Sequence, residues 1–495
     1  MGLLDVFRRP GKPPQRRAFD AANVGRLFSD WLTLTKSADS DIRFSLRAMR
    51  ARSRDLCQNN DYARRYLDLV RTNVVGPRGI TLQVRARENN GILDQTANQI
   101  LEGAFITWGQ PGICTVDGRL SWVDCQRMFM ESVARDGECF VLFVEDRANP
   151  YRFRLQFLDP DLIDQEKNEV LKNGNQIRMG IELDKRTKRP VAYHVLTYHK
   201  GDYDYMLPAN ERKYEIIPAD EMMHIYRVER AGQTRGVPWS AAAISSLKML
   251  HGYREAELVA ARTAAAKMGF FTSPAGDGFT ADGFDDPDNT VPIFDAEAGS
   301  FHQLPAGVTF QAFDPTHPTS AFADFEKAIL RGIAGGLGVS YTSLANDLEG
   351  TSYSSIRQGA LEERDFYKTL HRFMIDHFLD PLYRMWLEHV INFNFIPISG
   401  PQKFAKFSMD VSWRGRGFQW VDPLKEINAA VVGLQNGILS HTDIAANYGR
   451  DAEETFAQIE RDGETAAQFG LTMAYQPFGD KLPVPAEGQD ALQTD

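Results

Sequence analysis

A stretch of 31 residues, Pro238 to Met268, has no strong helix breaker after its first position and constrains the fold more than any other segment. Pro238 suits the first turn of a helix, where its missing N–H leaves no hydrogen bond unmade. Ile244, Leu247 and Leu250 then recur on one side, as in a helix with one buried face. At about 1.5 Å per residue, such a helix extends roughly 45 Å. Small residues crowd both of its ends, which predicts close packing against other helices.

Two more helices are expected near the N-terminus. In residues 39–57, Ile42, Leu46 and Met49 fall on one face, and a second segment runs from Tyr62 to Val74 before a Gly-Pro stop. A stripe of arginines follows the same helical rhythm beside the first apolar face: Arg43, Arg47, Arg50 and Arg54. We interpret this stripe as a solvated or subunit-pairing face, and contact with nucleic acid is the alternative.

Between these helices and Pro238 the chain mixes strands with short helices. Alternating or continuous apolar runs bounded by turn residues predict strands. The expected strands are Ile80–Val84, Glu138–Glu145, Phe153–Leu158, Ile177–Leu183 and Val191–Tyr198, with a charged turn at Asp184–Arg189. Strands in one part and long helices in others indicate the α+β class.

The second half of the chain is expected to be mainly helical. A helix from about Thr319 to Ala334 should be ended by Gly335-Gly336 and Gly338, and a polar loop should follow over residues 340–353. A longer helix begins near Ser354, and Pro381 should kink or break it because proline lacks the N–H and clashes with the preceding turn. The remaining expected elements are a strand at Phe404–Trp413 and two or three short helices between Pro423 and Phe469.

Charge is distributed unevenly along the chain. The formal net charge is −10, and the span from Met268 to Glu326 contains no Lys and no Arg. Its ten acids are Asp277, Asp282, Asp285, Asp286, Asp288, Asp295, Glu297, Asp314, Asp324 and Glu326. This span is either a solvated acidic loop or a surface that repels phosphates or docks a basic partner. A negative net charge also argues against tight nonspecific DNA binding, which depends on many Lys and Arg contacts to phosphates.

Sequence motifs for catalysis are mostly absent. There is no GxxxxGK[S/T] phosphate loop, no HExxH or CxxC pair and no GxSxG elbow, so no enzyme and no cofactor is predicted. Asp159, Asp161 and Asp164 could serve a metal-dependent nuclease, although a turn at a strand end explains them better. The longest apolar run is too short to span a bilayer, and no signal peptide is expected. The four cysteines lack metal-type spacing and are expected to be reduced thiols.

Several short strings occur in an order that resembles the lambda family of tailed-bacteriophage portal proteins. The most specific is Gly232-Gln233-Thr234-Arg235-Gly236-Val237. The others are Arg50-Ala51-Arg52-Ser53-Arg54-Asp55-Leu56, Arg135-Asp136-Gly137-Glu138, Leu158-Asp159-Pro160-Asp161, Phe313-Asp314-Pro315, Gly338-Val339-Ser340-Tyr341, Ser352–Arg357, Asp422-Pro423 and Gly449-Arg450-Asp451. Each string alone is weak evidence, but their shared order over roughly residues 40–470 makes the resemblance strong.

The resemblance implies a multidomain α+β subunit of a ring, with parts called wing, stem, clip, tunnel loop and crown. We expect a disordered basic tail (1–20), a wing (21–237 and 354–421), two stem helices (238–268 and 319–339), an acidic clip (269–318), a tunnel loop (340–353), a crown (422–476) and a second disordered tail (477–495).

The resemblance further implies a structural protein without catalysis. A ring of about twelve copies would form at one capsid vertex of the virion, after assembly in the host cytoplasm, and would pass double-stranded DNA during packaging and ejection. Its partners would be the terminase large subunit, head–tail connector or adaptor proteins, and major capsid and scaffolding proteins, with no membrane contact.

Candidate DNA-facing residues of the tunnel loop are Tyr341, Asn346, Asp347, Glu349 and Tyr353. Candidate docking residues of the clip are Asp277, Asp282, Asp285, Asp286, Asp288, Asp295 and Glu297. A metal-dependent nuclease and a nonspecific DNA-binding module remain the alternatives.

Overall fold

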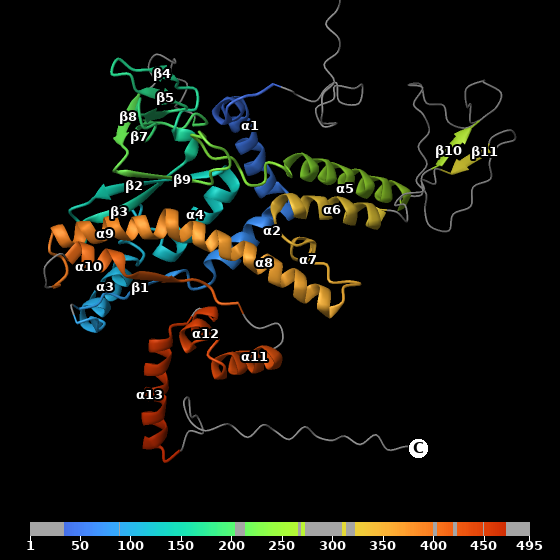
Figure 1. The fold of residues 1–495 in the computed structure, drawn as a ribbon. Coiled ribbons are helices and arrows are strands. Elements are labelled where there is room, and N and C mark those ends of the chain that lie inside the picture. The colour runs from blue at the N-terminus through green and yellow to red at the C-terminus, as the bar shows by residue number, and fades with distance from the viewer. Residues whose placement is uncertain are drawn as a thin grey trace, which may run out of the picture.

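The computed structural model describes residues 34–88, 90–202, 213–265, 269–272, 309–312, 322–398, 403–418, 423–448 and 450–471. It is a mixed helix and sheet fold with a broad body, a projecting pair of helices and a small group of C-terminal helices (Figure 1). Both tails and nearly all of the acidic span lie outside the described residues. The part of the chain that the structure describes contains no helix both long and apolar enough to cross a membrane.

The chain enters the body through two consecutive helices, as the sequence predicts. Helix α1 (Ala38–Asn59) starts at Ser37, whose hydroxyl accepts from the Ser40 N–H, and it buries Ile42 and Leu46. Asn60 ends α1 and caps α2 (Asp61–Val70), which continues through a π-helical turn (Arg71–Val75). Gly76 stops the helix with φ at +73°, a conformation that glycine adopts without strain.

The body contains an antiparallel three-stranded sheet and an antiparallel five-stranded sheet. In the first, β2 (Glu138–Glu145) lies between β3 (Phe153–Leu158) and β9 (Met222–Tyr226). The second contains β4 (Glu169–Val170), β5 (Gln176–Arg178), β6 (Ile181–Leu183), β7 (Pro190–Leu196) and β8 (Tyr214–Pro218). The strand expected at Ile177–Leu183 is wrong, because Met179 and Gly180 turn the chain with φ at 47° and 83° and divide it into β5 and β6.

Aromatic side chains dominate the main core. Helices α3 (Gln95–Trp108) and α4 (Trp122–Asp136) pack with α8 (Tyr353–Met374) and α9 (Asp380–Asn392) over the three-stranded sheet (Figure 1). Trp108, Phe129, Phe378, Tyr383 and Trp386 are at most 1% exposed. Phe129 and Phe378 stack with ring centroids 4.3 Å apart, so the two halves of the chain share one core.

Pro381 neither ends nor breaks the long C-terminal helix. A π-helical turn (Ile375–Leu379) joins α8 to α9, and the Asp380 N–H donates to the Ile375 carbonyl at the start of α9. Pro381 therefore stands in the first turn of α9, where a missing N–H is tolerated. The helix is therefore continuous at Pro381. Its irregularity is the π-helical turn just before this proline, and such turns are a known cause of helix bending.

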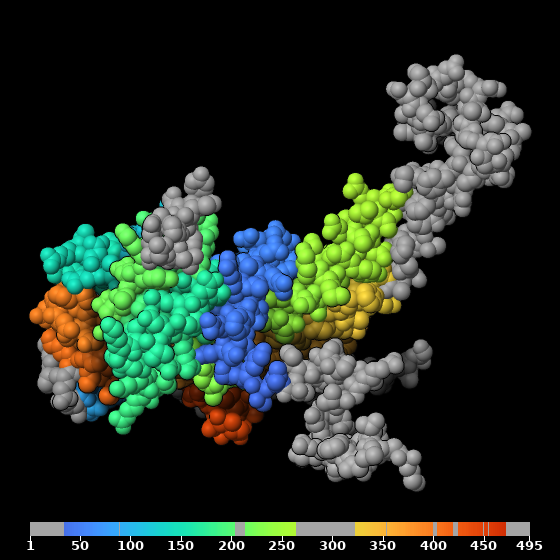
Figure 2. Space-filling model, turned by 90° about the horizontal axis from the view of Figure 1, so that it is seen from above, coloured from blue at the N-terminus to red at the C-terminus, as the bar shows by residue number. Residues whose placement is uncertain are grey.

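The projecting pair consists of α5 (Ile244–Ala265) and α6 (Phe322–Leu337), which lie side by side and extend away from the body (Figures 1 and 2). The expected helix from Pro238 begins later, at Ile244, because the intervening residues form turns. Of the three glycines expected to end α6, Gly335 and Gly336 lie within the helix, whereas Gly338, with φ at +75°, ends it as predicted. Beyond the pair, β10 (Gly269–Thr272) and β11 (Thr309–Ala312) join antiparallel.

The chain returns to the body before its last helices. The strand expected at Phe404–Trp413 is wrong in its first half: α10 (Lys403–Met409) is a helix that buries Phe407, and only β12 (Val411–Arg414) is extended. Strand β12 pairs with β1 (Thr81–Val84). Three short helices follow, as predicted: α11 (Pro423–Gln435), α12 (His441–Asn447) and α13 (Ala452–Gln468), called the C-terminal helices below.

Candidate functional site

Two arginines of the α1 stripe point into the protein rather than toward solvent. Arg50 is 2% exposed and donates to Glu138 Oε1 and Asp161 Oδ1, both at 2.6 Å. One turn later, Arg54 donates to Asp136 at 2.6 Å and to Asp161 at 2.9 Å. The prediction of a solvated or subunit-pairing face is therefore wrong for these two arginines, and neither is available to a DNA phosphate.

Glu138 lies at the centre of this network as the first residue of β2. It is fully buried and accepts from Arg50, from Arg235 at 2.6 Å, from the Gly236 N–H at 3.0 Å and from His224 Nε2 at 2.8 Å. A buried carboxylate is tolerated only when charged and polar partners replace water, and four groups do so here.

Arg235 uses all of its hydrogen-bond donors within the protein. Its Nε and one terminal nitrogen donate to Glu138, and the remaining N–H groups reach three backbone carbonyls, those of Pro160, Ile163 and Met179. The planar guanidinium thereby joins the strand end at Glu138, the short 3-10 helix at Pro160–Leu162 and the turn between β5 and β6.

Two glycines allow the chain to cross itself beside Glu138. Gly137, with φ at +90°, ends α4, and a Cβ there would lie 2.3 Å from the Val237 backbone. A Cβ on Gly236 would lie 2.1 Å from the Gly137 carbonyl oxygen. Both positions require glycine, because any side chain would separate the two segments whose polar groups meet at Glu138.

The electrostatics of the cluster favour the charged carboxylate and the neutral histidine. Burial opposes ionisation of Glu138, but the charges of Arg235 and Arg50 and the hydrogen bond with His224 hold the pKa of this carboxyl well below its usual range. Burial lowers the pKa of His224 from its ordinary value of 6.5, so its imidazole is neutral at pH 7. We call this set the ionic cluster: Arg50, Arg54, Arg135, Asp136, Glu138, Asp159, Asp161, His224 and Arg235.

The ionic cluster is assembled from strings that the sequence shows only as separate signatures. Arg50 and Arg54, the Asp136-Gly137-Glu138 turn, the Asp159-Pro160-Asp161 turn and the Gln233–Gly236 loop all meet at one place. The sequence analysis did not predict that these strings meet. The one local sign of it was that the strings combine charged residues with glycines, yet contain no recognisable catalytic motif. The cluster is an architectural site that locks α1, both sheets and the approach to α5 together.

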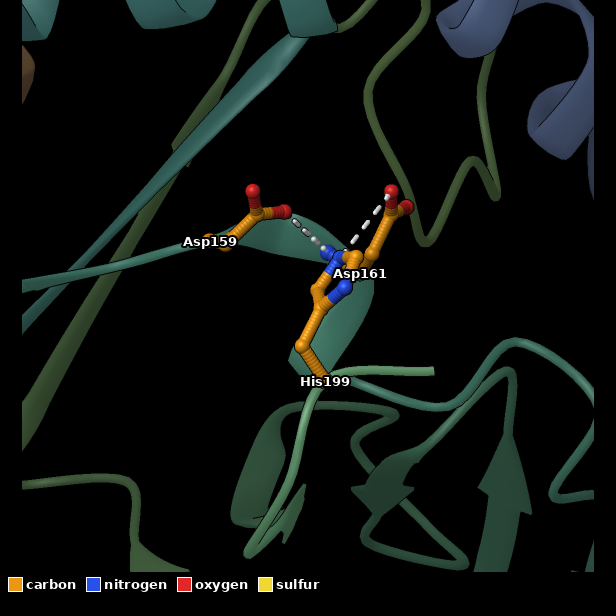
Figure 3. Close-up of side chains that lie close together, drawn as sticks. All are labelled: Asp159, Asp161 and His199. Atoms are coloured by element: carbon orange, nitrogen blue, oxygen red, sulfur yellow. Dashed lines mark hydrogen bonds and ion pairs between the residues drawn. The ribbon is translucent and has the colours of Figure 1, made fainter. Parts of the chain in front are cut away.

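At the edge of the cluster, Asp159, Asp161 and His199 form a carboxylate–imidazole group (Figure 3). Their nearest ligand atoms lie within 4.8 Å of one another, and His199 Nε2 is 3.8 Å from Asp161 Oδ2. Arg54 already pairs with both carboxylates, and Arg50 pairs with Asp161. Burial opposes ionisation of Asp161, but Arg50 and Arg54 outweigh it and lower the pKa of that carboxyl. A divalent cation would have to compete with two guanidinium groups.

Asp164 does not join the other two aspartates. It pairs with Lys200 and accepts from the Tyr214 hydroxyl at 2.8 Å. The three carboxylates considered for a nuclease therefore serve two different internal networks, and their geometry gives the nuclease alternative no support.

The polar loop expected over Ser340–Tyr353 is wrong for its first part, which is helical. The segment contains a short helix, α7 (Tyr341–Ala345), whose cap Ser340 hydrogen-bonds Glu363 of α8 at 2.8 Å. The Tyr341 hydroxyl donates to Asp347 at 2.7 Å. Partial burial and this hydrogen bond raise the pKa of Tyr341 to about 12, so the hydroxyl remains a donor at neutral pH.

The remaining predicted residues of this segment lie past α7. Asn346 ends the helix with φ at +53°, a conformation that asparagine adopts more readily than most residues. Asn346 and Glu349 are exposed, and Leu348 between them is 61% exposed. Tyr353 begins α8. The structure therefore brings Tyr341 and Asp347 together and leaves Asn346 and Glu349 at the surface.

The predicted docking residues of the clip belong to the acidic span. Asp277, Asp282, Asp285, Asp286, Asp288, Asp295 and Glu297 all lie outside the described residues.

A second ionic contact holds the C-terminal helices to the body. Asp451, immediately before α13, is 5% exposed and accepts from Arg85 at 2.9 Å and from Gln83 of β1 at 2.7 Å. Arg414 of β12 lies 2.8 Å from the same carboxylate oxygen. Beyond this contact, an open cavity of about 2380 Å³ lies between α13 on one side and β1, α3 and α8 on the other. Within the described residues, the Asp451 carboxylate thus ties the start of α13 to β1 and β12 of the body.

Comparison with known proteins gives a consistent result. The family model described as "Phage portal protein, lambda family" matches residues 24–371. The probable portal protein of Halomonas phage phiHAP-1 is 37% identical over 479 residues, which cover 95% of this chain and 90% of that protein. Portal protein B of Escherichia phage lambda is 24% identical over 494 residues, covering 91% and 90%.

Among solved structures, a chain from the neck of an empty GTA particle is similar, with a TM-score of 0.42 and 12% identity. The similarity covers 80% of this chain and 93% of that one.

Proposed function

Because this chain belongs to the lambda family of phage portal proteins, we propose that about twelve copies form a closed ring at one capsid vertex. The ring is a channel for double-stranded DNA during packaging and ejection, and a docking platform for the terminase large subunit and for head–tail connector proteins. Capsid and scaffolding proteins surround it during assembly in the host cytoplasm, and the finished ring stays in the virion. The family relationship over most of the chain is the observation that carries this proposal.

Portal proteins are structural proteins, and the proposed channel does no chemistry of its own. The sequence contains no GxxxxGK[S/T] loop, so the energy for packaging is assigned to a separate ATPase. The described part of the chain suits a rigid support: the ionic cluster fixes the body, and α5 and α6 project from it as the stem.

Residues 269–318 of the acidic span would act as the clip. Their eight acids without a single Lys or Arg would keep DNA phosphates away from the wall or attract a basic surface of the motor. The other two acids of the span, Asp324 and Glu326, belong to α6, where Glu326 pairs with Arg254. Salt screens such an effect within about 8–10 Å, so it operates only at close range.

Replacing Asp285, Asp286 and Asp288 with Asn tests the clip. We expect weaker motor docking and at least about tenfold less packaged DNA, because several charges at one contact act together. The matched control neutralises three exposed acids of the wing, Glu169, Glu215 and Asp220, and should package normally. Unchanged packaging by the clip variant would remove the acids from this role.

The Ser340–Tyr353 segment would act as the tunnel loop. Tyr341, Asn346 and Tyr353 are the proposed DNA contacts, and Asp347 and Glu349 would keep the contact from becoming tight. Deleting Asn346–Gly350 should reduce DNA packaging or retention about tenfold while rings still assemble, because the deletion leaves α7 and its Ser340–Glu363 bond in place. Normal packaging by the deletion variant would contradict the assignment.

Electron microscopy of the purified protein tests the proposal as a whole. Closed rings with a central hole wide enough for duplex DNA are expected. A protein that stays monomeric, with and without scaffolding and capsid proteins, would overturn the ring.

A further inference from the structure

The C-terminal helices do not bury enough apolar surface to be stable by themselves. Helices α11 and α12 have 13 and 7 residues, and isolated helices shorter than about 12–15 residues are marginal in water. Among the described residues from 423 to 471, only Gly433, Asp451 and Ala452 are buried. The cavity of about 2380 Å³ shows that the body does not cover α13 either. Some other surface must complete this part of the protein.

Helix α11 carries the apolar residues that such a surface would cover. Leu424, Ile427, Val431 and Leu434 are spaced three, four and three residues apart, the spacing of a seam between packed helices. Leu424 is 71% exposed, Ile427 41% and Val431 43%, and Ile438 just past the helix is 77% exposed. We call Leu424, Ile427, Val431, Leu434 and Ile438 the α11 seam.

The chemistry of the α11 seam fits a protein rather than DNA. All five of its side chains are aliphatic, and the neighbouring Lys425 and Glu426 carry opposite charges. A DNA-facing surface would instead present clustered Lys and Arg. An apolar surface left open in the subunit is unfavourable in water, so its partner should be available as soon as the chain folds. A second copy of the same chain meets that condition.

We propose that the α11 seam packs against the C-terminal helices of a second copy of this chain. In a ring of more than two copies each contact joins two different surfaces, so the seam needs a complement elsewhere on the same chain. The end of α13 offers one: Phe469 is 77% exposed and Leu471 is 66% exposed. The α11 seam of one copy therefore covers Phe469 and Leu471 of the next, and each neighbour completes the other's fold. This inference rests on the ring of the proposed function.

Two single substitutions in α11 form a matched test. Val431→Asp places a charge in the seam, whereas Ala429→Asp places the same charge two residues away on an exposed, nearly opposite side of the helix. Both positions are exposed in the subunit, so neither change disturbs its own core. Assembly is measured by light scattering and electron microscopy over a range of protein concentrations. We expect Val431→Asp to raise the concentration for half-assembly at least about tenfold, because a charge would be buried in an apolar contact. Ala429→Asp should stay within about twofold of the unchanged protein.

The outcomes separate this inference from the ring itself. If the unchanged protein and Val431→Asp assemble equally well, the α11 seam is not the contact and the ring proposal stands. If the unchanged protein does not assemble under any condition, both are overturned.

A second measurement does not depend on the charged variant folding. Val431→Cys and Leu471→Cys proteins are mixed, assembled and treated with a short bis-maleimide, to which the four buried native cysteines should not react. Covalent dimers in the mixture that are absent from either variant alone support the contact between α11 and α13. No more dimer in the mixture than in the separate variants would overturn that contact.

Discussion

At the residue scale, the molecule is organised around one buried carboxylate. Glu138 has no exposed surface and is held by Arg50, Arg235 and His224. Replacing such a network with apolar residues can be neutral, but removing one partner leaves an uncompensated charge in the interior. The cluster is therefore expected to respond much more strongly to single substitutions than exposed ion pairs do.

Arg235→Met tests this expectation. The change removes five donors from Glu138 and from the carbonyls of Pro160, Ile163 and Met179. We expect a loss of about 3–5 kcal/mol in the free energy of unfolding, measured by urea denaturation.

The control for Arg235→Met is Arg230→Met in the same loop. Arg230 pairs with Asp41 at the surface and its side chain is 55% exposed, so its loss should cost less than about 1 kcal/mol. Similar effects of the two substitutions would contradict the central role of Arg235.

At the element scale, turns and caps decide where the helices bend and where the chain attaches. The π-turn before Pro381 carries α8 into α9 without a break, and Gly338 stops α6 before α7. The C-terminal helices depend on Asp451, whose carboxylate is bound by Arg85, Gln83 and Arg414. Because Asp451 is one of only three buried residues among those described from 423 to 471, we expect this contact to affect how firmly the helices are held.

Asp451→Asn should release the C-terminal helices. The amide keeps the size of the side chain but loses the charge that Arg85 and Arg414 share. We expect limited proteolysis between α11 and α13 of the unassembled subunit to become at least about tenfold faster, while the body stays folded. Glu460→Gln, on the exposed surface of α13, is the matched control and should be cleaved at the original rate. Equal rates for both variants would show that Asp451 does not hold these helices.

At the scale of the whole molecule, one core joins segments from both halves of the chain. Phe129 of α4 stacks on Phe378, and β1 pairs with β12 more than three hundred positions later. Stability is therefore expected to be shared across the body, and a group that titrates in the core should affect the unfolding of the body as a unit.

The pH dependence of unfolding follows from buried histidines. Burial lowers the pKa values of His194, His224, His371 and His389 from 6.5. The unfolded chain therefore binds more protons than the folded chain below about pH 6.5, and stability falls as pH decreases through that range. The depressed pKa of Glu138 acts with the same sign at lower pH, below its ordinary value of 4.5.

Calorimetry should show this dependence directly. We expect Tm to be nearly constant above pH 7 and to fall by several degrees between pH 7 and pH 5. His224→Gln should have a shallower fall, since one buried imidazole no longer titrates. A Tm that stays constant or rises between pH 7 and pH 5 would contradict the assignment.

The sequence by itself determined much of this protein. The order of its short strings was sufficient to recognise the family, and local periodicity located α1, β2, β3 and the three C-terminal helices. Local signals of this kind depend on residues a few positions apart, so they can be read directly. The same periodicity misplaced the β5–β6 turn and α10, because a short apolar run fits a strand or a helix equally well.

Only the tertiary structure decided what the charged residues of these strings do. Arg50 and Asp161 are 111 positions apart, and Glu138 and Arg235 are 97 apart. No local pattern records such a pairing, because burial and partner choice arise only when α1, the two sheets and the Gln233–Gly236 loop pack together. For that physical reason, Arg50 and Arg54, which belong to a stripe typical of a solvated face, instead pair with carboxylates inside the protein.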